Sequence, residues 1–358
     1  MHHLYTFHRG PELGTRPLND WPCSLDRAME LLKTWYDDDK PFFTKKDLES
    51  VSNQMDRWRN GMKDGQMELV SVKGLSGSSI YYEMRTGQVI LGARQNEDWE
   101  MMEPKIRYLC YEQLTDSVKS GDIKLVEAFF PLQIEHFMNV RASDTKLPIS
   151  TEYIKNSVGV DECLKTMLGC WKQTPEWVNL TALLKLVATH KITKVVGIAS
   201  GSMEFGPDDD DWTFRSAVQH SVMTSVKEYI EETTDERIKC YAQDPHYTAV
   251  DTWALAEHGC KVLDDPRALL EIDDDCILFS CCPALPLKAI TNDFARPAML
   301  IWDSVVAKSH PGCHNPNSAR VQNMVYNEYD CYGFWDLHDT RLAPFRSDLV
   351  VYIRRQVE

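Results

Sequence analysis

The sequence predicts an α/β fold with a mostly parallel sheet, helices on both of its faces and an N-terminal α+β extension packed on it. Two observations predict this class. From about residue 192 short β-branched runs alternate with helical stretches, whereas the part before residue 150 mixes helical and β patterns without any repeat. We therefore expect residues 1–150 to form a helical region with a small β-meander and residues 151–358 to form the α/β domain. No Pro/Ser-rich linker separates the two regions, which favours close packing.

Length and composition narrow the class of protein further. A chain of 358 residues with 43% apolar residues can bury one large core or two smaller ones without disulfides. Its 11 cysteines are scattered from Cys23 to Cys331 and no cleavable apolar segment precedes them, so we expect a reduced compartment, the cytoplasm. No apolar run approaches the roughly 20 residues that cross a bilayer, so no membrane partner is expected. The net charge of −15 argues against general binding to nucleic acid, including DNA, because phosphate contacts need a positive face, although a local basic patch can still provide one.

The N-terminal region begins with helical signals. Ser24 before an amphipathic run predicts one capped helix, and Thr44 with Asp47 predicts a second. Short β-like segments separated by turns then predict the meander. Helical periodicity is expected again from about Trp99 to His136, and from Thr151 to His190 with a break near Pro175. The expected strands of the meander are Glu68–Val72, Ser79–Glu83 and Gln88–Leu91.

The α/β region has a regular order of strands and helices. Strands alternating with helices of this length imply right-handed crossovers and a parallel sheet, in a Rossmann-like arrangement. The expected strands are Thr193–Ala199, Arg237–Ala242, Cys260–Leu263, Cys276–Ser280 and Ala298–Ile301. The expected helices are Phe214–Ile230, Ala249–Glu257 and Leu285–Asp293.

Polar side chains gather directly after these strands. Ligands bind at the carboxyl ends of parallel strands, so hydroxyls, carboxylates, an imidazole and a phenol are expected on one rim, where a nucleophile with an acid or base could assemble. Glycines after the first strand allow positive φ or a close backbone approach. The residues concerned are Gly197 near the end of the first strand, Ser200, Gly201, Ser202 and Glu204 after that strand, Asp244, His246, Tyr247 and Asp251 after the second, Ser280–Cys282 after the fourth, and Asp303 after the fifth.

Structural explanations compete with these assignments. The serines can simply cap the next helix, Asp244 can form a turn before proline, and Asp303 can cap a helix. The acidic run 208–211 is most simply a solvated loop, with a counter-charge for a cationic substrate as its alternative. The basic window from Arg141 to Lys194 is most simply a solvated helical face.

No metal site and no cofactor are expected. The segment 310–314 contains two histidines and a cysteine, but no second ligand pair with zinc spacing appears elsewhere. Cys281 and Cys282 are adjacent, and both cannot easily reach one ion. The turn after the first strand lacks both GxGxxG and a P-loop lysine, so no nucleotide fingerprint is present.

The segment from Lys194 to about Val305 resembles the SRR-like domain, named for "sensitivity to red light reduced", in its fungal form. The matching residues include Arg215, Gly259 and Pro297-Ala298, but the most specific match is Gln243-Asp244-Pro245-x-Tyr247-x-x-x-Asp251. About a third of the chain is covered well, and the region from Trp35 to Leu48 resembles the fungal extension more loosely.

The resemblance implies two functions. Some members are regulatory proteins without agreed chemistry. Certain fungal proteins of this group are arginine-containing cyclodipeptide synthases of secondary metabolism, which use aminoacyl-tRNAs. Bacterial cyclodipeptide synthases carry a nucleophilic serine in a Gly-Val-Ser-type turn after a first strand. Gly197-Ile198-Ala199-Ser200 is similar but one residue longer, so Ser200 and Ser202 are both candidates for the nucleophile.

The synthase reading assigns a role to each expected site residue. Ser200 or Ser202 accepts the aminoacyl group, Asp244 and Tyr247 transfer protons or position the amine, and the backbone N–H groups of Gly201 and Ser202 stabilise the oxyanion. Glu204 or Asp303 pairs with an arginyl guanidinium. Gly197, Gly201 and Asp251 complete the expected substrate site. Arginyl-tRNA and a second aminoacyl-tRNA are the expected partners, and the basic window contacts them. A regulatory protein and an enzyme acting on a small metabolite in the same cleft are the alternatives.

Overall fold

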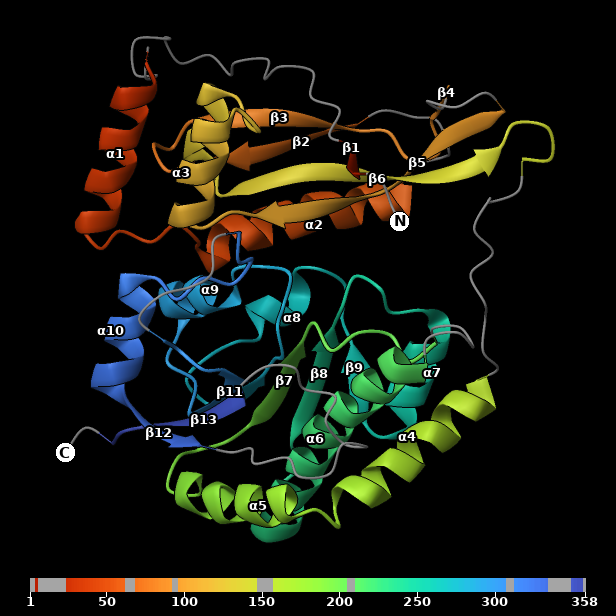
Figure 1. Cartoon of the computed structure of the whole chain (residues 1–358), viewed down its shortest axis with the longest axis vertical. Coiled ribbons are helices and arrows are strands. Elements are labelled where there is room, and N and C mark those ends of the chain that lie inside the picture. The colour runs from red at the N-terminus through yellow and green to blue at the C-terminus, as the bar shows by residue number, and fades with distance from the viewer. Residues whose placement is uncertain are drawn as a thin grey trace. The chain divides into compact units, whose positions relative to one another are not determined.

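A computed structural model describes residues 4–5, 24–61, 68–91, 96–146, 157–204, 210–306, 312–333 and 349–356. The chain divides into two compact units, residues 1–151 and 152–358. Figure 1 labels their helices and strands.

The helices of the first unit begin at the expected caps. Helix α1 (Leu25–Asp37) starts after Ser24, whose hydroxyl accepts from the Arg27 N–H. Helix α2 (Lys45–Gly61) starts after Thr44, whose hydroxyl accepts from the Asp47 N–H at 3.1 Å. Each hydroxyl satisfies a backbone donor that has no partner within its helix. Helix α3 (Tyr111–Ser120) and the 3₁₀ helix η2 (Leu125–Phe129) follow later in the chain.

The strands of the first unit differ from the expected meander. Strands β2 (Glu68–Lys73) and β3 (Ser79–Met84) form a two-stranded sheet, but β4 (Val89–Leu91) belongs to a second sheet in the order β1-β6-β5-β4. Its remaining strands are β1 (Leu4–Tyr5), β5 (Glu97–Tyr108) and β6 (Leu132–Ala142).

The helical prediction for residues 99–136 is therefore wrong over most of its length, with α3 and the short η2 as the helical parts. Strand β5 pairs with β6 over ten positions, and the register shifts between Met101 and Pro104. Such a bulge interrupts the two-residue alternation of a strand, so that the apolar spacing imitates a helix.

The second unit is built on a seven-stranded sheet in the order β12-β13-β11-β10-β7-β8-β9. The five expected strands are confirmed and pair in parallel. Strand β13 adds antiparallel to β11, and β12 adds antiparallel to β13; neither was expected. The strands are β7 (Lys194–Ile198), β8 (Lys239–Gln243), β9 (Cys260–Val262), β10 (Cys276–Phe279), β11 (Met299–Asp303), β12 (Tyr329–Gly333) and β13 (Leu349–Arg354).

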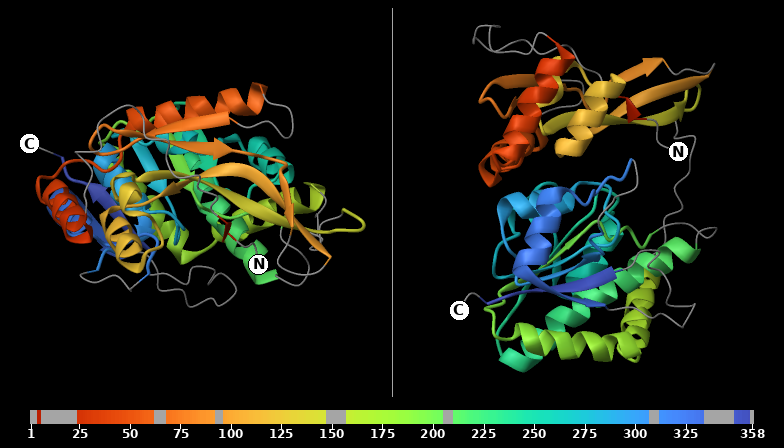
Figure 2. Two further views of the ribbon diagram at one scale, coloured as in Figure 1. Left: turned by 90° about the horizontal axis from the view of Figure 1, so that it is seen from above. Right: turned by 60° about the vertical axis from the view of Figure 1, so that its left-hand side comes forward.

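Helices cover both faces of this sheet (Figures 1 and 2). The strands β7, β8 and β9 follow one another in one direction across the sheet, so right-handed crossovers place α6 and α7 on one face. The sheet continues from β10 to β11 in the opposite direction, so the same handedness places α9 on the other face. The helices of the unit are α4 (Ser157–Trp171), α5 (Pro175–Val187), α6 (Asp210–Thr234), α7 (Ala249–Glu257), α8 (Arg267–Leu270), α9 (Leu287–Phe294) and α10 (Ala319–Glu328).

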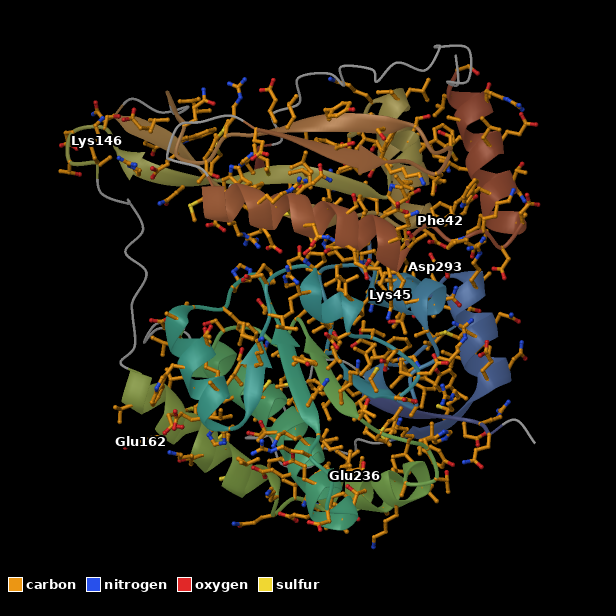
Figure 3. The ribbon with its side chains drawn as sticks, turned by 180° about the vertical axis from the view of Figure 1, so that it is seen from behind. Phe42, Lys45, Lys146, Glu162, Glu236 and Asp293 are labelled. Atoms are coloured by element: carbon orange, nitrogen blue, oxygen red, sulfur yellow. The ribbon has the colours of Figure 1, made fainter. Side chains whose placement is uncertain are left out.

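A single apolar cluster joins the sheet to the helices on the α6 face. It includes Val195 of β7, Ile277 of β10, Val222 of α6 and the fully buried Trp171 of α4. The Trp171 indole N–H donates to Ser225 Oγ at 2.9 Å, which satisfies its buried donor. Charged side chains such as Glu162 and Glu236 lie outside this core and are exposed (Figure 3). The core therefore fixes where the strands end, and those ends carry the candidate site.

Candidate active site

The turn after β7 has an unusual backbone. Ala199 has φ 60° and Gly201 has φ 74°, so the chain enters the left-handed region twice within three residues. A positive φ is costly at alanine and common at glycine. The Ala199 N–H donates to the Gln243 carbonyl at 2.8 Å, which ties this turn to the end of β8. The turn is thus held in a conformation that its own sequence does not favour.

Ser202 and Asp251 are joined by a buried hydrogen bond. Ser202 Oγ donates to Asp251 Oδ2 at 2.6 Å and accepts from the Glu204 N–H at 3.0 Å. Asp251 also accepts from the N–H groups of Met203 and Thr248 and from the Thr248 hydroxyl, as the third residue of the capping box of α7. Both side chains are buried and engaged, so they hold the β7 turn against the start of α7.

Asp244 fixes the other side of the turn. One of its carboxylate oxygens accepts from the Gly201 N–H at 2.8 Å, and the other accepts from the His246 N–H at 2.8 Å. The Gly201 N–H, one of the two expected donors to the oxyanion, therefore already donates to Asp244. The Ser202 N–H remains as the other expected donor.

Tyr247 and His220 form a hydrogen-bonded pair close to Ser200, in which His220 is buried and Tyr247 is half-buried. The Tyr247 hydroxyl lies 2.7 Å from His220 Nε2, and His220 Nδ1 lies 2.5 Å from the Ser216 carbonyl. Because a carbonyl only accepts, Nδ1 carries the proton, and Nε2 accepts from the phenol. His220 is 0% exposed and Ser200 is 1% exposed.

Burial governs the protonation of this pair. It raises the pKa of Tyr247 well above its usual value, and the negative charges of Asp244 and Asp251 act in the same direction. It lowers the pKa of His220, although the Ser216 carbonyl and the same two carboxylates oppose this shift. At neutral pH the phenol is protonated and the imidazole is neutral.

Ser200 lies close to Tyr247. It is near enough to Tyr247 to lower the pKa of the phenol slightly. Its Oγ nevertheless has no regular hydrogen-bond partner in the described part of the chain. A buried hydroxyl needs a hydrogen-bond partner, which an ordered water or a bound molecule can supply.

The sequence model of the SRR1 domain matches residues 179–331. This segment is similar to the SRR1 domain. The match runs from within α5 to β12 and includes every member of the cluster described above. Neither a comparison with curated proteins nor one with solved structures gives a significant match to this chain.

The other residues of the expected site make different contacts. Gly197 lies within β7, and a Cβ there would come 2.4 Å from Met223 Sδ, so the residue lets α6 approach the strand. Glu204 is buried, four residues beyond Ser200. Asp303 ends β11 and accepts from the Cys282 N–H at 3.0 Å, which places it with the loop after β10 rather than with Tyr247.

The sheet of the second unit has a topological switch point beside this cluster. Strand β7 lies between β8 and β10, which follow it in opposite directions across the sheet. Ser280 after β10 donates its hydroxyl to the Ile198 carbonyl at 2.8 Å, so the loops after β7 and β10 are neighbours. Crevices at such switch points are the usual ligand sites of open α/β sheets.

Sequence reasoning missed His220, because it does not follow a strand. It lies within α6, in a stretch whose buried residues are unusually polar. Hydroxyls and an imidazole in a buried helix must find partners, and that composition was the available signal. These buried polar residues are Ser216, His220, Ser221, Thr224 and Ser225.

Most cations of the expected tRNA-contacting window are paired with acids. Arg141 and Lys146 lie in the first unit and pair with Glu100 and Asp98. In the second unit the ion pairs are Lys165–Asp161, Lys172–Glu228, Lys194–Glu271 and Lys194–Asp273. Lys155 and residues 205–209 and 307–311 lie outside the described residues. No helix within the described ranges has the length and apolarity needed to cross a membrane.

Proposed function

We propose that this chain is an aminoacyl-tRNA-dependent cyclodipeptide synthase that makes an arginine-containing cyclic dipeptide through a seryl ester on Ser200. The observation that carries the proposal is the buried Ser200 hydroxyl, which lacks a regular partner and lies next to the hydrogen-bonded Tyr247–His220 pair. The proposal includes a Rossmann-like sheet, supported by the order β9-β8-β7-β10-β11 with the first strand in the middle.

The first chemical step is transfer of an aminoacyl group to Ser200. Ser200 Oγ attacks the ester carbonyl carbon, and its proton passes to the Tyr247 oxygen while the phenol proton passes to His220 Nε2. The charges of Asp244 and Asp251 stabilise the resulting imidazolium, since both act to raise the pKa of His220. The proton returns by the same route to the ribose oxygen of the departing tRNA. The Ser202 N–H is the proposed donor to the oxyanion.

Two further steps complete the ring. The amine of a second aminoacyl ester attacks the seryl ester, forms the first amide and releases Ser200. The free amine of the first amino acid then attacks the remaining ester, which forms the second amide and releases the second tRNA. Each step exchanges an ester for an ester or an amide, so no nucleotide triphosphate is required.

Glu204 is the proposed partner of the arginyl guanidinium. Its carboxylate is buried, and its N–H is bound to Ser202 Oγ, so the residue has a defined position in the β7 turn. A buried carboxylate and a guanidinium form the bidentate contact that arginine prefers. Asp303, the other candidate, already accepts from the loop after β10.

The test is mass spectrometry of the small molecules made by a host that expresses the chain. We expect an arginine-containing cyclic dipeptide with the wild type and none with Ser200→Ala. Ser221→Ala is the matched control, because Ser221 is equally buried but donates to the Ala217 carbonyl within α6. Product formation by folded Ser200→Ala protein would refute the proposed nucleophile.

A regulatory protein without catalysis is the second candidate, and the burial of Ser200 favours it. A side chain only 1% exposed meets a substrate only if the surrounding loops move. In this alternative Ser200 is structural, so no new dipeptide forms in any host, and Ser200→Ala changes no biological function of the chain.

A further inference from the structure

The loop after β10 brings two thiols and a carboxylate together. One ligand atom each of Cys281, Cys282 and Asp303 lies within 4.8 Å of the other two. Successive side chains in a strand point to opposite faces. Cys282 has φ 49°, however, and this left-handed residue ends the alternation. The adjacent cysteines therefore do converge, contrary to the expectation from their spacing.

The separations suit a tetrahedral ion. Zn²⁺ bound by a thiolate at about 2.3 Å and a carboxylate oxygen at about 2.0 Å separates the two ligand atoms by about 3.5 Å. Cys282 Sγ and Asp303 Oδ1 are 3.5 Å apart. Two thiolates on one such ion are about 3.8 Å apart. The ligand atoms of this cluster lie within 4.8 Å of one another, so this separation is compatible with the structure.

A buried cation next to the cluster balances its charge. Lys288 is 2% exposed, and its ammonium donates to Asn317 Oδ1 at 2.7 Å. Burial lowers the pKa of Lys288, and the negative charges of Asp303, Cys313 and Cys282 oppose this effect. Two thiolates and a carboxylate carry three negative charges, which Zn²⁺ and the ammonium together neutralise. Buried charges are stable only when they are balanced in this way.

We propose that Cys281, Cys282 and Asp303 form a Zn²⁺ site at the carboxyl ends of β10 and β11. Soft thiolates with one carboxylate favour Zn²⁺ over Mg²⁺ or Ca²⁺. Three protein ligands leave one tetrahedral position open, as in zinc sites that meet a substrate, whereas structural sites have four. Cys282 is exposed, so the open position is accessible. The site is independent of the chemistry proposed for Ser200.

Cobalt provides a spectroscopic test on the full-length, tag-free chain in reducing, oxygen-free buffer. Titration of the wild type with Co²⁺ should produce a thiolate-to-cobalt charge-transfer band and the intense visible bands of tetrahedral Co²⁺, saturating at one equivalent and disappearing when Zn²⁺ is added. Cys282→Ser and Asp303→Asn should each weaken binding about 100-fold or more, since even outer-shell changes cost 10–100-fold. Cys170→Ser, which removes an exposed thiol of α4, should leave the titration unchanged.

A second measurement needs no variant and guards against misfolding. Zn²⁺ should protect Cys281 and Cys282 of the wild type from alkylation, while exposed Cys170 and Cys331 should react equally with and without the ion, as mapped by mass spectrometry. The proposal is overturned if the wild type gives no charge-transfer band, if folded Cys282→Ser keeps the full band, or if Zn²⁺ protects neither adjacent thiol.

Discussion

His220 is a neutral, fully buried imidazole, and its ionisation is linked to the stability of the fold. Its pKa in the folded chain lies below the usual value of 6.5, chiefly because burial disfavours the charged form. Below pH 6.5 the unfolded chain therefore binds a proton that the folded chain does not. The stabilisation is complete above pH 6.5 and is lost as the pH falls through the window below it.

We expect the free energy of unfolding of the wild type to fall between pH 7.5 and 5.5 more steeply than that of His220→Gln. The difference in slope should approach, and not exceed, about 1.4 kcal/mol per pH unit, the limit for one proton. His190, whose pKa is also lowered by burial, contributes equally to both chains and cancels. Urea titrations at several pH values measure the slopes, and parallel slopes would mean that the pKa of His220 is the same in the folded and unfolded chains.

Tyr247 is the residue that the proposed proton route needs most. Tyr247→Phe keeps the ring in its cavity but removes the hydroxyl that bonds His220 Nε2. Loss of a positioned acid or base typically costs 10²–10⁴-fold in rate, so we expect dipeptide formation to fall by about that factor. Tyr241→Phe is the control, because Tyr241 lies on β8 at a distance from the β7 turn. Equal losses in both variants would indicate a general effect of a missing phenol rather than a proton route.

Among the elements, α6 and β7 approach each other unusually closely. The Met223 side chain of α6 occupies the space where a Cβ at Gly197 would be, and both residues are buried in the core. We expect Gly197→Ala to destabilise the chain by about 1–3 kcal/mol, the usual cost of overpacking. That cost should be smaller when Met223→Ala is already present. Gly169→Ala at an exposed position of α4, where no atom lies within 4 Å of an added Cβ, should be neutral or stabilising. Thermal unfolding of these variants tests the expectation, and equal costs in both backgrounds would contradict it.

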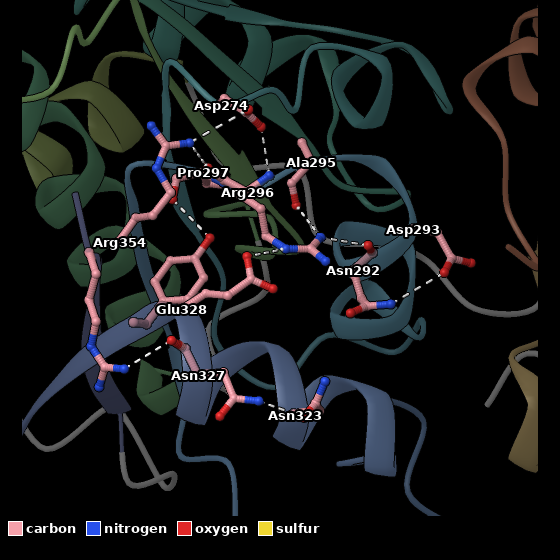
Figure 4. A network of polar contacts seen from close by, with 12 residues as sticks. Asp274, Asn292, Asp293, Ala295, Arg296, Pro297, Asn323, Asn327, Glu328 and Arg354 are labelled. Carbon is pink, nitrogen blue, oxygen red and sulfur yellow. Dashed lines mark hydrogen bonds and ion pairs between the residues drawn. The ribbon is translucent and has the colours of Figure 1, made fainter. Parts of the chain in front are cut away.

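Arg296 joins three segments of the chain near the amino ends of β10 and β11 (Figure 4). Its Nε donates to Glu328 of α10 at 2.7 Å, and its Nη1 donates to the Asn292 and Ala295 carbonyls at the end of α9. The backbone N–H of the same residue donates to Asp274 before β10. A guanidinium supplies several donors in a fixed plane, which an ammonium cannot.

We expect Arg296→Ala to lower the free energy of unfolding by about 1–2 kcal/mol, since the side chain is about one-third exposed and its ion pair is screened. Arg296→Lys should recover less than half of that loss. Denaturant titration measures both, and full recovery by lysine would mean that charge alone, rather than the planar donor set, matters here.

The individual helices and strands show which parts of the fold and of the site could be predicted from the sequence. Three of the parallel strands, β7, β10 and β11, were predictable because each is a short, almost fully buried apolar run followed by small or polar residues. Strand β5 was not, because its bulge near Pro104 disturbs the alternation. In the site, Asp244, Tyr247 and Asp251 could be found from their position after β8. His220 and the convergence of Cys281 with Cys282 depend on helix packing and on one positive φ, which the order of residues does not reveal.

At the scale of the whole molecule, the segment that matches the family model is shorter than the compact unit that contains it. Residues 179–331 omit α4, whose Leu164 and Trp171 belong to the apolar cluster of the second unit. They also omit β13, which lies between β11 and β12 and contributes Val351 and Ile353 to that cluster. Without β13, β11 would become an edge strand, with its ladder groups exposed.

We therefore expect a fragment of residues 152–358 to fold alone and a fragment of residues 179–331 not to. The longer fragment keeps the whole seven-stranded sheet and its covering helices, and it corresponds to one compact unit. It should unfold in a single cooperative transition, as domains of this size usually do. The shorter fragment should show no cooperative transition and should aggregate through the uncovered strand edge. Calorimetry and size-exclusion chromatography distinguish these outcomes. Cooperative unfolding of the 179–331 fragment would mean that α4 and β13 are accessories to a smaller, self-sufficient core.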